Sequence, residues 1–226
     1  MQEDDILDDF LNEDDSDLLS FEQRIEQKIR DGYEFRMGDY ISKAFDIFQQ
    51  NIGYFIGFAL LYMVIQLALN FIPFLGSLGA LVINAPLGVG YAIMARKISR
   101  DEPYEFGDFF RGFDAVLQLF LGGLIVGIFV VIGSVFLIIP GIFLGVCYVF
   151  VSLIIYFENQ DFWPAMEYSR RLITKNWWSV FGFVIILVLL NFAGALVLGI
   201  GLLVTIPVSG IAIYVAYEDI LENQRY

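Results

Sequence analysis

Six long apolar blocks, separated by polar segments, dominate the pattern of hydrophobic and polar positions along the chain. Each block is close to the roughly 20 residues that a helix needs to cross the hydrocarbon core of a bilayer. Runs such as Val184–Leu190 show no alternation of polar and apolar residues, which argues against membrane β-strands. The pattern therefore predicts an all-α membrane protein with six transmembrane helices. They are expected at about 51–72, 75–95, 116–139, 141–157, 177–198 and 199–217.

The connections alternate between very short uncharged turns and longer charged segments, so the blocks pair into three helical hairpins. An amphipathic segment, here called an elbow, precedes each hairpin and is expected to lie in the membrane interface. Residues 44–51 of the first elbow match residues 169–176 of the third elbow, which is expected at 161–176, and the middle elbow, at 109–118, is a weaker copy. A repeat of roughly sixty residues indicates triplication of one elbow-plus-hairpin unit. A shared hydrophobic bias is the alternative explanation.

Pro86 and Pro207 occupy matching positions inside the second blocks of the first and third hairpins. A proline inside a helix removes one backbone donor and is expected to kink the helix. Three polar residues within the blocks, Asn84, Asn191 and Thr205, are candidates for lining a polar path between such helices. The alternative is that they hydrogen bond across helices and serve only packing.

All 13 Lys and Arg residues fall on one side of a six-span arrangement. By the positive-inside rule that side faces the cytoplasm, so both ends of the chain are expected to be cytoplasmic. The predicted spans themselves contain no Asp, Glu, Lys or Arg. This composition argues against a proton-coupled pump or a voltage sensor, which need ionisable groups within the membrane.

Residues 1–19 are strongly acidic, with nine Asp or Glu and no Lys or Arg. This segment is expected to be a disordered cytoplasmic tail. It accounts for most of the net charge of −13, because the rest of the chain carries 17 acids against 13 bases. Nucleic acid is excluded as a partner, since its phosphates would be repelled.

Four apolar residues of the tail would form one stripe if the segment became helical. They are Ile6, Leu7, Phe10 and Leu11. Such a stripe is typical of a docking motif that folds on a cytoplasmic protein. The alternative is a solvating tail in which apolar residues are merely scattered.

Residues 20–37 are expected to form a cytoplasmic amphipathic helix that ends at Gly32. Residues 38–220 would then form the membrane domain and residues 221–226 a cytoplasmic C-terminus. Glycines four positions apart within the spans predict close helix packing inside the bundle, with an oligomer through the same faces as the alternative. These pairs are Gly53 and Gly57, Gly123 and Gly127, and Gly141 and Gly145.

The chain has no histidine and one cysteine, Cys147, which lies inside an apolar block. His-based acid–base catalysis, Ser-His triads and thiolate metal clusters are therefore excluded. We predict no catalytic residue, no metal site and no cofactor. Carboxylates of the connections, such as Asp108 and Glu158, are interpreted as a solvated face and as helix caps.

Three segments, Ala165–Gly182, Gly199–Pro207 and Ala216–Asp219, resemble uncharacterised bacterial six-span membrane proteins. These proteins are similar to the membrane domain fused to some glycerophosphoryl diester phosphodiesterases. The resemblance covers residues 40–220 and implies a protein of the bacterial cytoplasmic (inner) membrane. It implies no catalytic residues, because the sequence holds no counterpart of the soluble phosphodiesterase domain.

Two functions follow from these observations, and a membrane enzyme is the least favoured third. The first is a non-enzymatic accessory or scaffold protein whose acidic tail binds a cytoplasmic partner. The second is a transporter or channel for an uncharged or lipid-like solute, which would use the polar path and the kinked helices. A polar cavity that reaches the bilayer midplane would favour the second function, and a dry packed interior the first.

Overall fold

The computed structural model describes residues 21–72, 75–136, 138–197 and 199–221, and over these ranges the chain is all-α. Six helical segments within them are long and apolar enough to cross a membrane, so the prediction of an all-α, six-span integral membrane protein is confirmed. The spans are α4 (Ile52–Asn70), α5 (Leu75–Ser99), α6 (Val116–Phe136), α7 with α8 (Ile138–Cys147 and Val151–Phe157), α10 (Trp177–Leu196) and α11 (Leu202–Leu221).

Each hairpin is preceded by a helical elbow, as predicted. The elbows are α3 (Met37–Gln50), the 3₁₀ helix η1 (Phe106–Ala115) and α9 (Phe162–Lys175). The first and third meet their spans in the same way, since Asn51 has φ −140° and ψ 45° and Asn176 has φ −127° and ψ 38°. Both carbonyls accept hydrogen bonds from the amides three and four residues later. The middle elbow instead continues into α6 through Val116 in a helical conformation.

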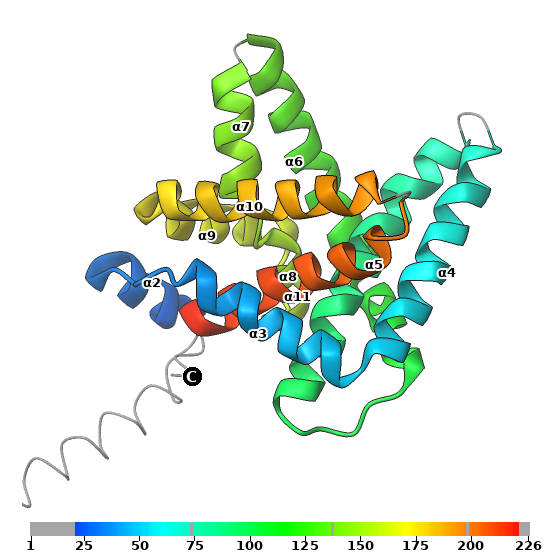
Figure 1. Cartoon of the computed structure of the whole chain (residues 1–226). Coiled ribbons are helices and arrows are strands. Elements are labelled where there is room, and N and C mark those ends of the chain that lie inside the picture. The colour runs from blue at the N-terminus through cyan, green and yellow to red at the C-terminus, as the bar shows by residue number, and fades with distance from the viewer. Residues whose placement is uncertain (1–20, 73–74, 137, 198, 222–226) are drawn as a thin grey trace, which may run out of the picture.

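The three hairpins diverge from a shared base that holds the elbows (Figure 1). The hairpin of α6 and α7 projects in one direction and that of α4 and α5 in another. Within the base, α11 lies alongside α3 and against α5. A further helix, α2 (Phe21–Asp31), packs on α9, and Gly32 follows its end at φ +82°. Together α2 and α3 form an N-terminal strap, residues 21–50, across the base.

Some glycines allow the two helices of a hairpin to pack closely, whereas others lie on the surface of the hairpins. A Cβ atom at Gly141 would collide with Ser134 of α6, so this glycine allows α6 and α7 to touch. Gly53, Gly123 and Gly127 instead face open space. Close packing within the bundle therefore holds for Gly141, and an oligomer through the open glycines of α6 stays a prediction.

The fourth span differs from the prediction because it is interrupted at residues 148–150, between α7 and α8. An interruption within a membrane leaves backbone carbonyls without helical donors, and these need other partners. One of them, the carbonyl of Cys147, accepts a 2.7 Å hydrogen bond from the buried hydroxyl of Ser169 on α9. The elbow of the third unit thus supports the broken span of the second.

Two spans extend beyond their predicted ends. α5 continues to Ser99 instead of 95, and α11 continues to Leu221 instead of 217. Their last turns therefore carry charged residues that the predicted boundaries had left outside the helices. These are Arg96 and Lys97 in α5 and Glu218 and Asp219 in α11.

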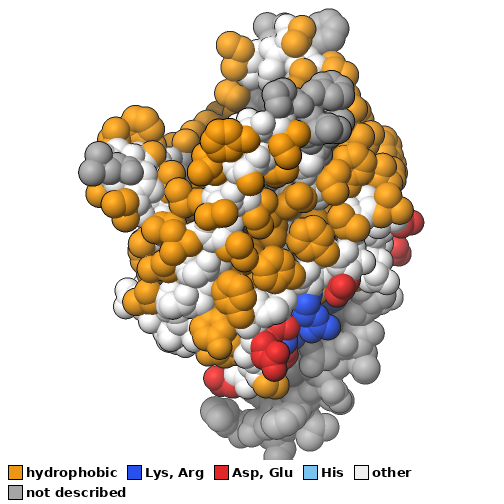
Figure 2. All heavy atoms as spheres, turned by 90° about the vertical axis from the view of Figure 1, so that its right-hand side faces the viewer, with side chains coloured by type: hydrophobic (Ala, Val, Ile, Leu, Met, Phe, Trp, Pro, Cys, Tyr) orange, Lys and Arg blue, Asp and Glu red, His pale blue; other side chains and the backbone are white. Residues whose placement is uncertain are grey.

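Apolar side chains cover most of the face shown in Figure 2, and the charged side chains visible there gather toward its lower part and right edge. Many of the most exposed large hydrophobic residues, including Phe71, Val135 and Ile139, lie near the hairpin turns, and Trp178 lies at the start of α10. A soluble protein rarely exposes so continuous an apolar surface. Lipid is the environment that such a surface fits.

Candidate functional site

Three carboxylates at the base, with side chains only 1–10% exposed, each contact one arginine and one tyrosine. The groups are Glu158 with Arg24 and Tyr217, Glu218 with Arg100 and Tyr214, and Asp219 with Arg36 and Tyr40. The tyrosine hydroxyls lie 2.6–2.7 Å from the carboxylate oxygens, and the arginine nitrogens lie 2.5–3.6 Å from them. Because a buried charge is costly without partners, these contacts are what allow the carboxylates to lie inside the protein.

The interpretation of the connecting carboxylates as a solvated face is wrong for two of them. The side chain of Glu158 is only 10% exposed, and it is held by Arg24. Asp108 is buried and lies 2.8 Å from the ammonium of Lys97. It also accepts the amide of Glu105 in a capping box, so the expectation of helix caps holds at this position.

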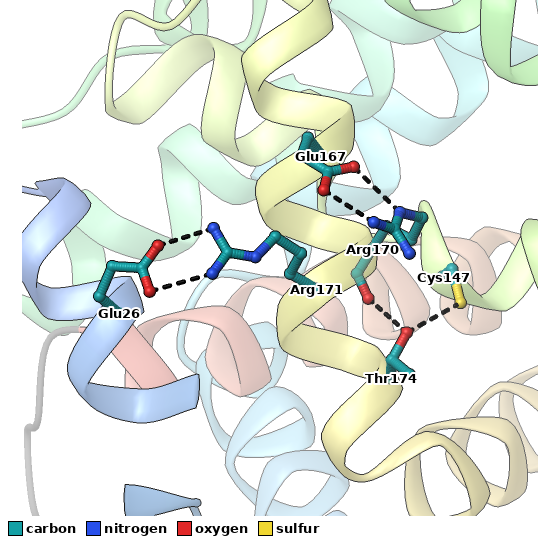
Figure 3. A network of polar contacts seen from close by, with 6 residues as sticks. All are labelled: Glu26, Cys147, Glu167, Arg170, Arg171 and Thr174. Atoms are coloured by element: carbon teal, nitrogen blue, oxygen red, sulfur yellow. Dashed lines mark hydrogen bonds and ion pairs between the residues drawn. The ribbon is translucent and has the colours of Figure 1, made fainter. Parts of the chain in front are cut away.

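The strap is fastened to α9 by surface contacts as well (Figure 3). Arg171 donates two hydrogen bonds to Glu26, at 2.6 and 3.0 Å, and these bonds lower the pKa of that carboxyl. On the same elbow, Arg170 pairs with Glu167 three residues earlier. The apolar face of α9 packs against the protein, so the elbow is a structural support of the base.

The three residues proposed for a polar path do not form one path. Asn191 donates a 2.7 Å hydrogen bond to Ser209, and Ser209 donates to the carbonyl of Thr205, so two of the three meet between α10 and α11. Asn84 instead accepts hydrogen bonds from Tyr62 and Gln66 of α4. Each set of hydrogen bonds joins the two helices of one hairpin. These contacts fit the alternative interpretation, in which the polar residues serve helix packing.

A pocket of about 230 Å³ lies near the middle of four spans, α4, α5, the interrupted fourth span and α11. We call it the mid-span pocket. Its lining is mainly apolar, with hydroxyls on Tyr62, Tyr91 and Ser152. Tyr91 is 3% exposed, and its hydroxyl has no hydrogen-bond partner within the part of the chain that the structure describes. Three irregular points of the helices are close in sequence to residues that line this pocket. They are Pro86 in α5, Pro207 in α11 and the break at 148–150.

A second pocket, of about 380 Å³, lies where α5, η1 and α8 meet, and we call it the elbow pocket. Its lining is mainly charged and aromatic, with Ile93 and Ala115 as aliphatic members. It includes Arg96, Lys97, Arg111, Glu102, Asp114, Tyr156 and Phe157. The guanidinium of Arg96 lies 4.8 Å from the ring centre of Phe157, a cation–π contact.

The two pockets lie one beyond the other along the same faces of α5 and α8. On α5 the mid-span pocket is lined by residues from Gly88 to Ala92 and the elbow pocket by residues from Ile93 to Lys97, so the two linings adjoin. On α8 the lining passes from residues 152 and 153 to residues 156 and 157. With a helical rise of about 1.5 Å per residue, the two linings together extend about 14 Å along α5, from Gly88 to Lys97. An apolar chamber near the middle of the spans and a charged chamber at the base match the two ends of an amphiphile.

Sequence reasoning missed both pockets and the three carboxylate groups. Their residues come from elements far apart in the chain, and spacing alone does not show that they meet. One signal was present, since the charged residues Arg96, Lys97, Glu218 and Asp219 follow their apolar blocks without a break in helical character. The docking residues Ile6, Leu7, Phe10 and Leu11 lie outside the described residues.

Comparisons of the chain with protein-family models, with curated proteins and with solved structures found no match. The resemblance to the membrane domain of some phosphodiesterases therefore stays a prediction. Within the described ranges, no group of three or more His, Cys, Asp or Glu side chains is arranged to hold a metal ion. The pockets and the charged groups are the features on which a function must rest.

Proposed function

We propose that this chain is a non-enzymatic transporter for a lipid-like, amphiphilic solute in the bacterial cytoplasmic membrane, with both of its ends in the cytoplasm. The observation that carries the proposal is the pair of pockets along α5 and α8. A membrane amphiphile has an apolar part and a polar head a short distance apart, and the two chambers offer matching surroundings in that order. The mid-span pocket is apolar rather than the polar cavity that was expected of a transporter, so the arrangement supports a lipid-like solute and not a polar one.

The lining of the mid-span pocket supports an uncharged, mainly apolar occupant. Its hydroxyl groups offer hydrogen bonds but no charge, so an ester or hydroxyl of a lipid-like molecule suits it. The buried hydroxyl of Tyr91 is the strongest polar element. A buried donor without a partner costs free energy, and an acceptor on the occupant would remove that cost.

The backbone around the mid-span pocket supports movement. Pro86 and Pro207 each remove one helical hydrogen bond close to the pocket, and the fourth span is broken beside it. Helix breaks near the centre of the membrane are where many transporters bind their solutes and bend. Three of the four lining spans therefore have a weak point within a few residues of the pocket lining.

The acidic tail supports a separate proposal, in which a basic cytoplasmic protein binds residues 1–19. Its nine acids would attract such a partner, and the stripe of Ile6, Leu7, Phe10 and Leu11 would bury against it. This proposal needs no pocket, so it stands or falls independently of transport. Recovery of a partner by the intact chain, and its loss when the four residues are changed to Ser, is the test.

The transport proposal is tested by filling the mid-span pocket. Gly88 lines the pocket, and a Cβ atom there meets nothing within 4 Å, so Gly88→Leu should fill the space without moving the backbone. Gly123→Leu is the matched control, because Gly123 also faces open space but lies on α6, away from both pockets. Native mass spectrometry of the proteins in mild detergent measures the bound amphiphile.

Gly88→Leu should retain much less co-purified amphiphile than the parent protein, and Gly123→Leu should retain the same amount. In vesicles, Gly88→Leu should also slow the exchange of a fluorescent lipid analogue between leaflets. Equal retention by both variants and the parent would show that the pocket is not the binding site.

A further inference from the structure

We infer that the elbow pocket recognises the phosphate and ammonium groups of a zwitterionic phospholipid head. This inference rests on the proposed function and names the class of its solute. The pocket is lined by both cationic and anionic side chains, including Arg111 and Asp114 on the same helix η1, together with aromatic rings. No single-charge ligand satisfies both sets of side chains.

Two guanidinium groups provide the phosphate side of the pocket. Arg96 is held against the ring of Phe157 at 4.8 Å, and Arg111 projects from η1 with 55% of its side chain exposed. A guanidinium presents two parallel donors that match two oxygens of a phosphate, and stacking on a ring keeps its plane fixed. The pair is thus suited to a phosphodiester.

The charge of the pocket decides between a zwitterion and an anion. Asp108 lies 2.8 Å from Lys97 and 3.8 Å from Arg111, so both of these cations have an acidic neighbour. With Asp108 counted, the three basic side chains of the lining are balanced by three acids, of which the other two are Glu102 and Asp114. The two acids would repel a second negative charge, while they would attract an ammonium group next to the phosphate. A head with one charge of each sign fits this balance.

The position of the pocket indicates a lipid rather than a free phosphate ester. Its η1 residues Asp114 and Ala115 directly precede the apolar α6. The polar head region of a bilayer is expected where an amphipathic helix passes into an apolar one. The mid-span pocket continues along α5 in the direction that an acyl chain would follow.

The test compares lipid binding by the full chain and its variants, after delipidation in detergent, by titration followed with native mass spectrometry. The ligands are phosphatidylethanolamine, the anionic phosphatidylglycerol, and glycerophosphoethanolamine, which has the same head without acyl chains. The variants are Arg111→Gln and Asp114→Asn. Arg170→Gln is the matched control, because Arg170, like Arg111, is exposed and lies near an acid three residues earlier.

We expect the parent to bind phosphatidylethanolamine tightest, Arg111→Gln to bind it about tenfold more weakly, and Arg170→Gln to match the parent. Asp114→Asn should shift the preference toward phosphatidylglycerol. Equal binding of the two lipids, unchanged in Arg111→Gln, would overturn this inference while leaving the transporter proposal in place. Binding of glycerophosphoethanolamine as tight as that of the intact lipid would also overturn it, in favour of a soluble phosphate ester. No binding of any lipid by the parent would overturn the proposed function itself.

Discussion

The hydroxyl of Tyr40 donates a 2.6 Å hydrogen bond to Oδ2 of Asp219, and this bond joins the strap to the last turn of α11. Arg36, which directly precedes α3, donates a hydrogen bond to the other oxygen of the same carboxylate. The side chain of Asp219 is 8% exposed, so its charge depends on these two donors. The strap is therefore part of the folded base, and its loss would expose a carboxylate group that the base has buried.

Tyr40→Phe should lower the free energy of unfolding by about 1–3 kcal/mol, because it removes a buried hydrogen bond to a charged acceptor. For a chain of this size that corresponds to a fall in melting temperature of roughly 2–12 °C. Tyr168→Phe is the control, since Tyr168 makes the same kind of bond to Glu22 at an exposed site, and its effect should be much smaller. Thermal unfolding in detergent measures both. Equal effects of the two changes would contradict a buried role for Tyr40.

Lys43 should make stability depend on pH in the alkaline range. Burial lowers its pKa to about 8 from the ordinary 10.5, although Glu218 and Asp219 act in the opposite direction. A lowered lysine pKa means that the folded state disfavours the charged form. This cost is fully present below pH 8 and disappears as the pH rises toward 10.5.

Lys43→Met removes that cost, so its melting temperature relative to the parent should be highest at or below pH 8. The difference should shrink as the pH rises from 8 to 10.5, because the parent then loses the charge as well. Melting curves of both proteins across this range provide the measurement. A difference that stays constant with pH would show that Lys43 keeps an ordinary pKa.

Gly88 and Gly90, two residues apart on α5, should respond to alanine with opposite signs. Gly88 faces open space, so Gly88→Ala should stabilise the helix by up to about 1 kcal/mol. At Gly90 a Cβ atom would collide with the backbone carbonyl of Phe109 in η1, so Gly90→Ala should destabilise the protein. Chemical or thermal unfolding of the two variants compares them directly. Destabilisation by Gly88→Ala would show that the pocket wall at this position is closed.

The six spans and the three elbows were predictable because each is a local pattern. A run of about 20 apolar residues crosses a bilayer whatever it packs against. The Asn51 and Asn176 junctions were also visible as a repeat in the sequence. What the pattern did not show was the extension of α11 to Leu221, since Glu218 and Asp219 look like the end of a span until their partners are known.

The candidate site was much less predictable than the fold. Asn84 and Asn191 were singled out because they are polar residues in apolar blocks, yet each hydrogen bonds within its own hairpin. The pockets depend instead on aliphatic, aromatic and charged residues of α5, α8 and η1 that have no unusual composition. Such a surface arises from the packing of distant elements, and the resulting pairs, such as Arg24 with Glu158, have no signature in spacing.

Both ends of the chain are proposed to be cytoplasmic, and single cysteines in a Cys147→Ala background test this. Phe71 and Ile200 lie near two hairpin turns and are 78% and 65% exposed, so Phe71→Cys and Ile200→Cys should react with a membrane-impermeant maleimide from outside. Glu102→Cys, in the connection between the first and second hairpins, should react only after the membrane is opened. The reverse pattern would invert the topology, and labelling of all three from outside would contradict six spans.

The central claim, that an amphiphile occupies the pockets between α5 and α8, is tested most directly by photo-crosslinking. A phospholipid analogue with a photoreactive group in its acyl chain is added to the purified protein in nanodiscs, and the labelled peptides are mapped by mass spectrometry. The account predicts adducts at the mid-span pocket, on residues 88–92 and 149–153, and their loss in Gly88→Leu but not in Gly123→Leu. Adducts confined to outward residues such as Val135 and Phe192, with none at the pocket, would contradict it.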